Sequence, residues 1–332
     1  MMNYGHCQNT ERCCSLNKTT YNLMFKSRLL VGIFYFCTMI AYNPKDWFTF
    51  IFRFHKSDTV RQLFPMIVAI AVYSLLVSYL EIHIIHISKE SQLKNLSLIY
   101  SMLGFVISLL LVFRTNTAYD RWWEGRRLWG QLINCSRNLS VKLNQLLPDD
   151  TIHKTALKSL IPYFAVSLKA HLRNEKTIPE LDENAQTKDR FDFHSSIQHL
   201  PNQVAKEIFE EIDLLYKEGV ITDMQLLLIN NDYQQFIEIC GACERIKNTP
   251  IPYSYSAFLK KFIFFYIMLM PFAYVASLGY TIIPVTVFTF YILTSIELIA
   301  EEIENPFGSD ANDLPLDELC KNINRTCSEI FS

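Results

Sequence analysis

The chain has 332 residues, of which 50% are hydrophobic and 19% are charged, and its formal net charge is −2. A nearly neutral chain with a pI of about 6.5 is not built to coat nucleic acid, and its apolar content excludes a disordered chain. Nine cysteines, an odd number, do not indicate a secreted disulfide framework.

Four stretches contain no Asp, Glu, Lys or Arg: Leu29–Pro44, Gln62–Leu80, Asn95–Phe113 and Phe262–Ile296. A helix needs about 20 apolar residues to cross a bilayer, so the second and third stretches predict one span each. The fourth stretch predicts two spans, 262–282 and 285–303, separated near Pro284 because proline interrupts a helix. The first stretch is short and predicts either an interfacial helix or a tilted span.

The alternative is a water-soluble all-α protein with buried core helices. Ile67–Leu80 and Leu103–Phe113 disfavour it, because they are apolar on every side whereas a surface helix needs a polar face. The first 22 residues are polar and do not resemble a cleavable signal peptide, so we expect the spans in the mature chain. Basic residues beside the spans predict that both termini and the block 115–261 are cytoplasmic, with the hairpin tips near 89–94 and 280–285 outside.

Residues 115–261 are predicted to form a helical cytoplasmic domain. A helical pattern recurs in four segments, and a polar segment at Asn174–Asp192 predicts a loop; the helical segments are Arg121–Leu147, Thr151–Arg173, Asn202–Glu218 and Thr222–Lys247. The chain therefore divides into five regions: an N-terminal tail (1–24), a first membrane region (25–114) with an interfacial segment and spans at 62–88 and 95–114, the cytoplasmic domain (115–261), a second membrane hairpin (262–303), and an acidic C-terminal loop with a helix (304–332).

Motifs of nucleotide-driven pumps and of common hydrolases are absent, since the sequence has no P-loop, Rossmann glycine pattern, nucleophile elbow or HExxH. Cys240 and Cys243 have CxxC spacing without a second ligand pair nearby, so they are predicted to be ordinary helix cysteines. The segment His6–Cys14 favours a plain tail over a metal site. Residues 81–86, with one Glu and two His at the end of the second stretch, favour a membrane boundary over a metal pair.

The third stretch has a small, partly polar face formed by Ser97, Ser101, Gly104 and Ser108 beside an apolar face. Small residues let membrane helices pack closely, whereas an apolar face can line a narrow pore that gates by dewetting. Both interpretations are open for this helix.

Two segments outside the spans carry dense functional groups. Thr117–Gly130 combines tryptophans and arginines typical of an interfacial belt, in which Asp120 and Glu124 are predicted to pair with Arg121 and Arg127 and to fix a helix bend. The segment 301–316 crowds carboxylate and amide oxygens into a short loop. It predicts either a capped turn or a site for a hard cation such as Ca²⁺.

These two segments contain FRTNTAYDRWWEGR (113–126) and NPFGSDANDLPLD (305–317), which resemble motifs of the bestrophin family, most closely its bacterial branch. The resemblance extends from about Phe25 to the end of the chain. It implies a homopentameric ion channel with one central pore and a hydrophobic neck, which falls by position on Leu98, Met102 and Phe105. A shift of one residue would bring Ser97 and Ser101 to the neck instead. The resemblance also suggests Val204 as a constriction at the cytosolic exit.

The acidic loop is similar to the calcium clasp of eukaryotic bestrophins. Asp310 and Asp313 match its side-chain ligands, and Glu302 and Asn305 match positions that offer backbone carbonyls. The acidic run of those members is interrupted here by residues 311–312, which argues against calcium activation. Ca²⁺ is the one cofactor that the resemblance suggests.

We therefore expect an all-α membrane protein, a bestrophin-like homopentamer with four transmembrane helices per subunit in the bacterial inner membrane. It is expected to contact lipid and to conduct small monovalent ions passively, with chloride favoured, and not to be an enzyme. The alternatives are a sodium-conducting bacterial bestrophin, a transporter, and a membrane metalloenzyme with His83 and His86 facing Glu301 or Glu302. Inverted repeats and charged midplane residues, which are typical of transporters, are not seen in the sequence.

Overall fold

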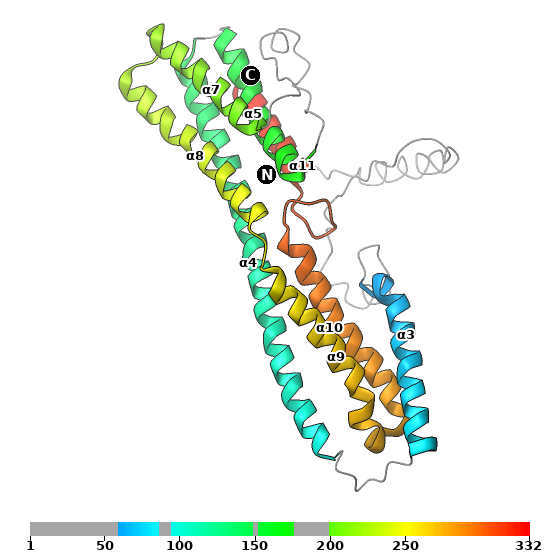
Figure 1. The fold of residues 1–332 in the computed structure, drawn as a ribbon. Coiled ribbons are helices and arrows are strands. Elements are labelled where there is room, and N and C mark those ends of the chain that lie inside the picture. The colour runs from blue at the N-terminus through cyan, green and yellow to red at the C-terminus, as the bar shows by residue number, and fades with distance from the viewer. Residues whose placement is uncertain (1–58, 86–93, 149–151, 176–198) are drawn as a thin grey trace, which may run out of the picture. The chain divides into compact units, whose positions relative to one another are not determined.

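The computed structural model describes residues 59–85, 94–148, 152–175 and 199–332, and every regular element in these ranges is helical (Figure 1). The expected all-α fold class is therefore confirmed for the described residues. Several predictions concern residues outside these ranges: the tail 1–24 with His6–Cys14, the stretch Leu29–Pro44, His86, and most of the tip near 89–94 and of the loop 174–192.

The helices follow one another in the order α3 (Thr59–Leu80), the π-helical turn η1 (Glu81–Ile85), α4 (Lys94–Leu146), α5 (Ile152–Arg173), α7 (Leu200–Lys217), α8 (Asp223–Asn248), α9 (Tyr253–Leu278), the 3₁₀ turn η2 (Gly279–Thr281), α10 (Ile282–Glu304) and α11 (Leu316–Ile330). Helices α5, α7 and α8 begin and end within one or two residues of the bounds expected from the sequence. Local signals explain this agreement: the Gln225 side chain accepts the Thr222 backbone N–H at 2.8 Å, which caps α8.

Among the described residues, three helical stretches are long and apolar enough to cross a membrane: Thr59–Ile84, Leu98–Leu146 and Tyr253–Glu304. The last of these, Tyr253–Glu304, consists of α9 and α10, which are joined by η2 and pack against each other. Gly279 permits this turn with a φ of +55°, and Pro284 falls in the first turn of α10, where proline is tolerated. The hairpin expected from the fourth stretch is present, but its turn precedes Pro284.

The end of α3 and the α9–α10 turn lie together at one end of the membrane helices. His83 Nε2 is 3.0 Å from the Tyr280 hydroxyl, whereas at the other end of these helices Ser295 Oγ donates to Thr59 Oγ1 at 3.0 Å. Glu301 follows Ser295 and is therefore about 30 Å along α10 from the turn. The alternative of a metal held jointly by His83 and Glu301 or Glu302 is wrong for this reason.

Helix α4 is one uninterrupted helix of 53 residues, which makes it about 80 Å long (Figure 1). Its first half packs against α9 and α10, and its second half packs against α5, α8 and α11. The boundary expected at 114/115 falls inside this helix, and the helix is not broken at Thr117–Gly130, where a bend was expected. We call α3, α9, α10 and the first half of α4 the membrane group, and the second half of α4 with α5, α7, α8 and α11 the helical domain.

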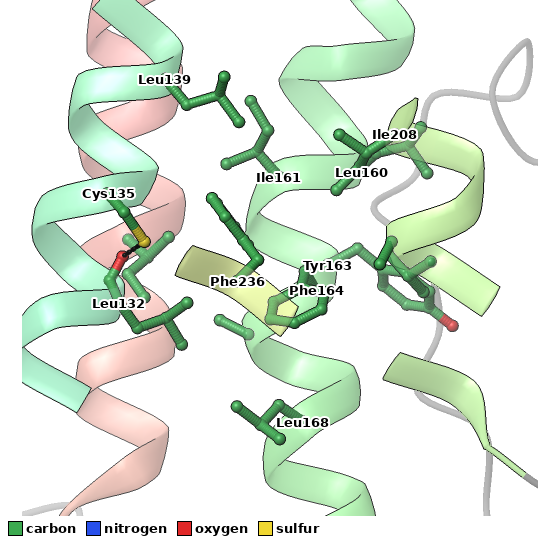
Figure 2. Close-up of a cluster of buried hydrophobic side chains, with 14 of the residues drawn as sticks. Leu132, Cys135, Leu139, Leu160, Ile161, Tyr163, Phe164, Leu168, Ile208 and Phe236 are labelled. Atoms are coloured by element: carbon green, nitrogen blue, oxygen red, sulfur yellow. Dashed lines mark hydrogen bonds between the residues drawn. The ribbon is translucent and has the colours of Figure 1, made fainter. Parts of the chain in front are cut away.

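An apolar core holds the helical domain together, and Figure 2 shows part of it with side chains from α4, α5, α7 and α8. Phe164 of α5 meets Phe236 of α8 edge to face, with ring centroids 5.0 Å apart. Cys240 and Cys243 belong to this core, and burial raises the pKa of the Cys240 thiol to about 12. The prediction that they are ordinary helix cysteines fits this burial, since both side chains pack in the apolar core.

Candidate functional site

The membrane half of α4 has one covered face and one open face. Tyr100, Ile107 and Leu111 are buried among side chains of the other membrane helices. Leu98, Met102 and Phe105, the three residues expected at a pore neck, are 68%, 66% and 72% exposed in the single chain. Their spacing puts them on one side of the helix, so α4 presents an apolar stripe that the other described residues of its own chain leave uncovered.

The small residues of α4 are divided between these two faces. Gly104 lies against α9, because a Cβ atom at this position would come within 2.7 Å of the Tyr266 hydroxyl. Ser101 and Ser108 are exposed, and Ser108 Oγ donates to the Gly104 carbonyl at 2.8 Å. Close packing of α4 against α9 thus depends on Gly104, while the apolar stripe points elsewhere. Close packing therefore uses one face of this helix, and pore lining would use the other.

A charged junction lies where α4 leaves the membrane group. The side chain of Arg114 is 1% exposed, and its Nη2 is 2.7 Å from Glu304 Oε2 while its Nε is 3.6 Å from Glu297 Oε2. Glu304 Oε1 accepts the backbone N–H of Ile251 at 2.7 Å. One carboxylate at the end of α10 therefore holds both α4 and the segment that leads into α9.

Arg121 extends the junction two turns further along α4. Its guanidinium donates to the backbone carbonyls of Glu304 at 3.0 Å, Thr249 at 2.6 Å and Ile246 at 2.6 Å. These carbonyls end α10 and α8, where a helix leaves acceptors unsatisfied and favours positive charge.

The predicted partners of this junction were wrong. Glu124 pairs with Arg245 of α8 at 3.2 Å, and Arg121 binds backbone carbonyls instead of its neighbouring carboxylates. Glu304, the residue shared by Arg114 and Arg121, was not predicted from the sequence. The one available signal was an acidic residue in the last turn of a span, directly before Asn305 and Pro306.

The loop between α10 and α11 contains a buried carboxylate. Asp313 Oδ2 accepts the backbone N–H of Asp310 at 2.6 Å, and Asp313 Oδ1 is buried without a hydrogen-bond partner. Burial raises the pKa of Asp313 to about 7, against the opposing effect of nearby Arg173. Gly308 is required here, because a Cβ atom at that position would lie 2.6 Å from Asp313 Oδ2.

All four residues expected in a calcium clasp are near this loop. Glu302 lies in the last turn of α10 and Asn305 caps the helix. Glu302 Oε2 accepts a hydrogen bond from Asn312 Nδ2 at 2.6 Å, and the Asn312 carbonyl accepts one from Trp122 Nε1 of α4 at 3.0 Å. The unpaired Asp313 oxygen and the surrounding oxygen donors fit the chemistry of a hard cation.

Val204 does not have the position that the resemblance suggests. It is 0% exposed and belongs to the core of the helical domain, on a face of α7 that packs against other helices. A side chain enclosed within one subunit does not narrow an ion pathway. The prediction of a constriction at Val204 is therefore wrong.

The fold and these sites together define an all-helical membrane protein whose longest helix carries an uncovered apolar stripe and a buried charged junction. The family model described as Bacterial/Fungal Bestrophin protein matches residues 39–329. The chain belongs to this bacterial and fungal branch of the bestrophins, as its two sequence motifs predicted.

Individual relatives agree with this assignment. A protein of Nostoc sp. named voltage-dependent anion channel-forming protein is 35% identical over 293 residues, which cover 87% of this chain and 92% of that protein. YneE of Escherichia coli K12, with the same descriptive name, is 30% identical over 289 residues, covering 86% and 91%. A crystal structure of a bacterial bestrophin homologue from Klebsiella pneumoniae matches with a TM-score of 0.70 at 28% identity, covering 81% of this chain and 98% of that one.

Proposed function

We propose that this chain forms a homopentameric channel that conducts anions, chloride above all, through a pore lined by α4. The observation that carries the proposal is the apolar stripe of Leu98, Met102 and Phe105, which the described helices of the chain leave open. The names of the Nostoc and Escherichia coli relatives, both called anion channel-forming proteins, support anions over the sodium alternative.

Five copies of α4 around one axis would stack the stripe into three apolar rings. A narrow apolar passage sheds water and closes, and a small widening fills it again, so the stripe would act as a gate. The stripe carries no charged side chain between Leu98 and Phe113. Selectivity in the neck would then depend on the positive ring edges of Phe105, which attract anions weakly.

The membrane topology that we propose has four crossings per subunit, formed by α3, the first half of α4, α9 and α10. The His83–Tyr280 contact supports it, because it joins the end of α3 to the α9–α10 turn. With both termini cytoplasmic in a bacterial inner membrane, this end faces outward and the helical domain faces the cytosol.

A planar bilayer containing the purified full-length protein tests the channel proposal. Under a potassium chloride gradient we expect currents whose reversal potential lies toward the chloride equilibrium potential. Phe105→Ala shortens the apolar ring and is expected to raise the current severalfold, because a wider and less apolar neck wets more readily. Phe264→Ala is the matched control, since Phe264 is an equally apolar, exposed residue on α9.

Three results would each overturn a different part of the channel proposal. Absence of current in several salts would refute conduction, and a reversal potential toward potassium would refute anion selectivity and favour the cation-conducting alternative. Equal currents from both variants would show that the α4 stripe faces lipid.

We further propose that the α10–α11 loop binds Ca²⁺ through Asp310 and Asp313, with the carbonyls of Glu302 and Asn305. The unpaired, buried Oδ1 of Asp313 is the observation that favours it. A bound ion would supply positive charge to that carboxylate. Calcium should then raise the unfolding temperature of the wild-type protein and not that of Asp313→Asn; an equal rise in both would contradict the site.

A further inference from the structure

Three elements of the helical domain bring two histidines and one carboxylate to a common point. His171 lies in the last turn of α5, His199 is the residue before α7, and Glu244 lies in α8. Glu244 Oε1 is 2.8 Å from His171 Nε2 and 2.5 Å from His199 Nε2. The three atoms that could bind a metal all lie within 4.8 Å of one another.

We propose that His171, His199 and Glu244 form a binding site for a divalent transition metal, with Zn²⁺ as the ion that fits it best. Imidazole nitrogen and carboxylate oxygen are the ligands that Zn²⁺ accepts in proteins, and three of them leave one tetrahedral position for water. Ca²⁺ and Mg²⁺ prefer oxygen ligands throughout, so the two imidazoles select against them.

The exposure of the cluster suits an ion that enters from solvent. The three side chains are 26%, 31% and 26% exposed, in the order His171, His199, Glu244, so the site is neither sealed nor flat on the surface. Side chains from three separate elements also restrict one another, with the imidazole rings 4.5 Å apart. Ligands that are already oriented lose little freedom when a metal binds.

The charges around the cluster leave the ligand atoms available. The pKa of His171 is lowered, chiefly by burial and then by His199, so its imidazole is neutral near pH 7 and offers a lone pair. A neighbouring ammonium is that of Lys247, whose Nζ donates to the His171 carbonyl at 2.7 Å and to Asn174 Oδ1 at 2.6 Å. These two bonds hold its charge at the end of α5.

Metal binding would change one hydrogen bond in a specific way. His199 Nδ1 accepts the backbone N–H of Asn202 at 3.2 Å and so caps α7. A neutral imidazole that binds a metal through Nε2 carries its proton on Nδ1, where it cannot accept this N–H. Zn²⁺ would therefore replace the cap of α7 with a bond that joins the start of α7 to α5 and α8.

This relationship supplies a variant that separates the metal from the fold. Asparagine is a good N-cap residue but a poor zinc ligand, so His199→Asn keeps the capping function and removes one ligand. Glu244→Gln removes the carboxylate and keeps a similar shape. His153→Asn is the control. His153 Nδ1 is 2.7 Å from Glu211 and His153 Nε2 is 3.5 Å from Glu218. The two carboxylates contact different ring nitrogens, so these three side chains do not bring their ligand atoms to one point.

The experiment is a titration of the purified full-length protein, stripped of metal with a chelator, with zinc sulfate against a chromophoric competitor. We expect wild type and His153→Asn to bind one more zinc per chain than His199→Asn and Glu244→Gln, or to bind it at least tenfold more tightly. Zinc should also raise the unfolding temperature of wild type and leave that of His199→Asn unchanged, while the two proteins unfold alike without zinc.

The proposal is overturned if wild type binds no zinc, or if His199→Asn and Glu244→Gln bind it as wild type does. A loss that His153→Asn shares would also overturn it, because zinc would then depend on the general state of the helical domain. Neither result depends on ion conduction, so the zinc site stands or falls independently of the channel.

Discussion

Glu304 is the carboxylate at which α4, α10 and the start of α9 meet, and Glu304→Gln measures how much the charged junction stabilises the protein. In the native chain both carboxylate oxygens are used, Oε2 by Arg114 Nη2 and Oε1 by the Ile251 N–H, each at 2.7 Å. Glutamine has one acceptor oxygen and one NH₂ group. In the variant, either the Arg114 guanidinium or the Ile251 N–H must therefore face the glutamine NH₂ group instead of an acceptor oxygen.

The expected loss of stability follows from the burial of Arg114. Its side chain is 1% exposed, so its charge is far from water and needs a partner. Removing one partner of a buried ion pair destabilises a protein by about 3–5 kcal/mol. Because Glu297 remains 3.6 Å from Arg114, we expect the lower end, about 3 kcal/mol.

Thermal unfolding of the detergent-solubilised protein, followed by tryptophan fluorescence, tests this value. At about 2–4 °C per kcal/mol, the variant should unfold roughly 6–12 °C below wild type. Glu124→Gln is the matched control, because the Glu124–Arg245 pair is 35% and 67% exposed and such pairs contribute about 0–1 kcal/mol. Equal shifts for the two variants would refute the argument that burial makes the junction strong.

Three further substitutions test the charges and the packing of the described helices. Burial alone would raise the pKa of Asp317, but hydrogen bonds from Lys169 and Arg173 outweigh it and lower the pKa, so its stabilising effect is present above the unfolded pKa near 4 and is lost as pH falls through the lower folded pKa. Asp317→Asn should therefore unfold below wild type at pH 7, by about 1 kcal/mol, and the gap should narrow steadily as thermal unfolding is repeated at pH values below about 4; a gap that stays constant in acid would contradict this. Gly104→Ala should lose about 1–3 kcal/mol because a tyrosine hydroxyl of α9 lies 2.7 Å from the added Cβ. Gly241→Ala is the control, because a Cβ atom added there would meet no neighbour among the described residues within 4 Å, and it should gain about 0.5–1 kcal/mol of stability by the same assay. Stability changes of equal sign in the two glycine variants would contradict the packing argument.

The bounds of α5, α7 and α8 could be predicted because their signals are local. Hydrophobic side chains repeat at helical spacing, Pro201 stands in the first turn of α7, and Thr222 with Gln225 marks the start of α8. The three residues of the open stripe of α4 were named by the resemblance to bestrophins, and helical spacing explains why they share a face whatever packs around them. Periodicity determines a face before any tertiary contact forms.

The end of the first half of α4 could not be predicted as a helix end, because composition and secondary structure change at different places. Charged residues begin at Arg114, which marks the membrane boundary, but α4 continues to Leu146. The partners of Arg121 also lay beyond the reach of the sequence. They are backbone carbonyls at two helix ends, which every residue possesses, so side-chain charge pointed to the wrong partner.

Sites that join separate helices need the tertiary arrangement, and the cluster of His171, His199 and Glu244 shows why. His199 and Glu244 are 45 residues apart, and neither lies in a motif with metal-ligand spacing. Their meeting depends on how α5, α7 and α8 pack around the shared core. The packing of apolar side chains in the core determines which helix ends come together. It gives the polar residues that meet there no recognisable sequence pattern.

The single helix α4 gives these separate features a mechanical relationship. The stripe at 98–105, the junction residues Arg114 and Arg121, and the core residues beyond Leu128 all belong to one helix without an interior break. A long helix without an interior proline curves only gently and does not kink, so it transmits displacement along its axis. In the proposed channel, a movement of the helical domain would therefore reach the neck through α4. The bonds from Arg114 and Arg121 to α10 would be what resists it.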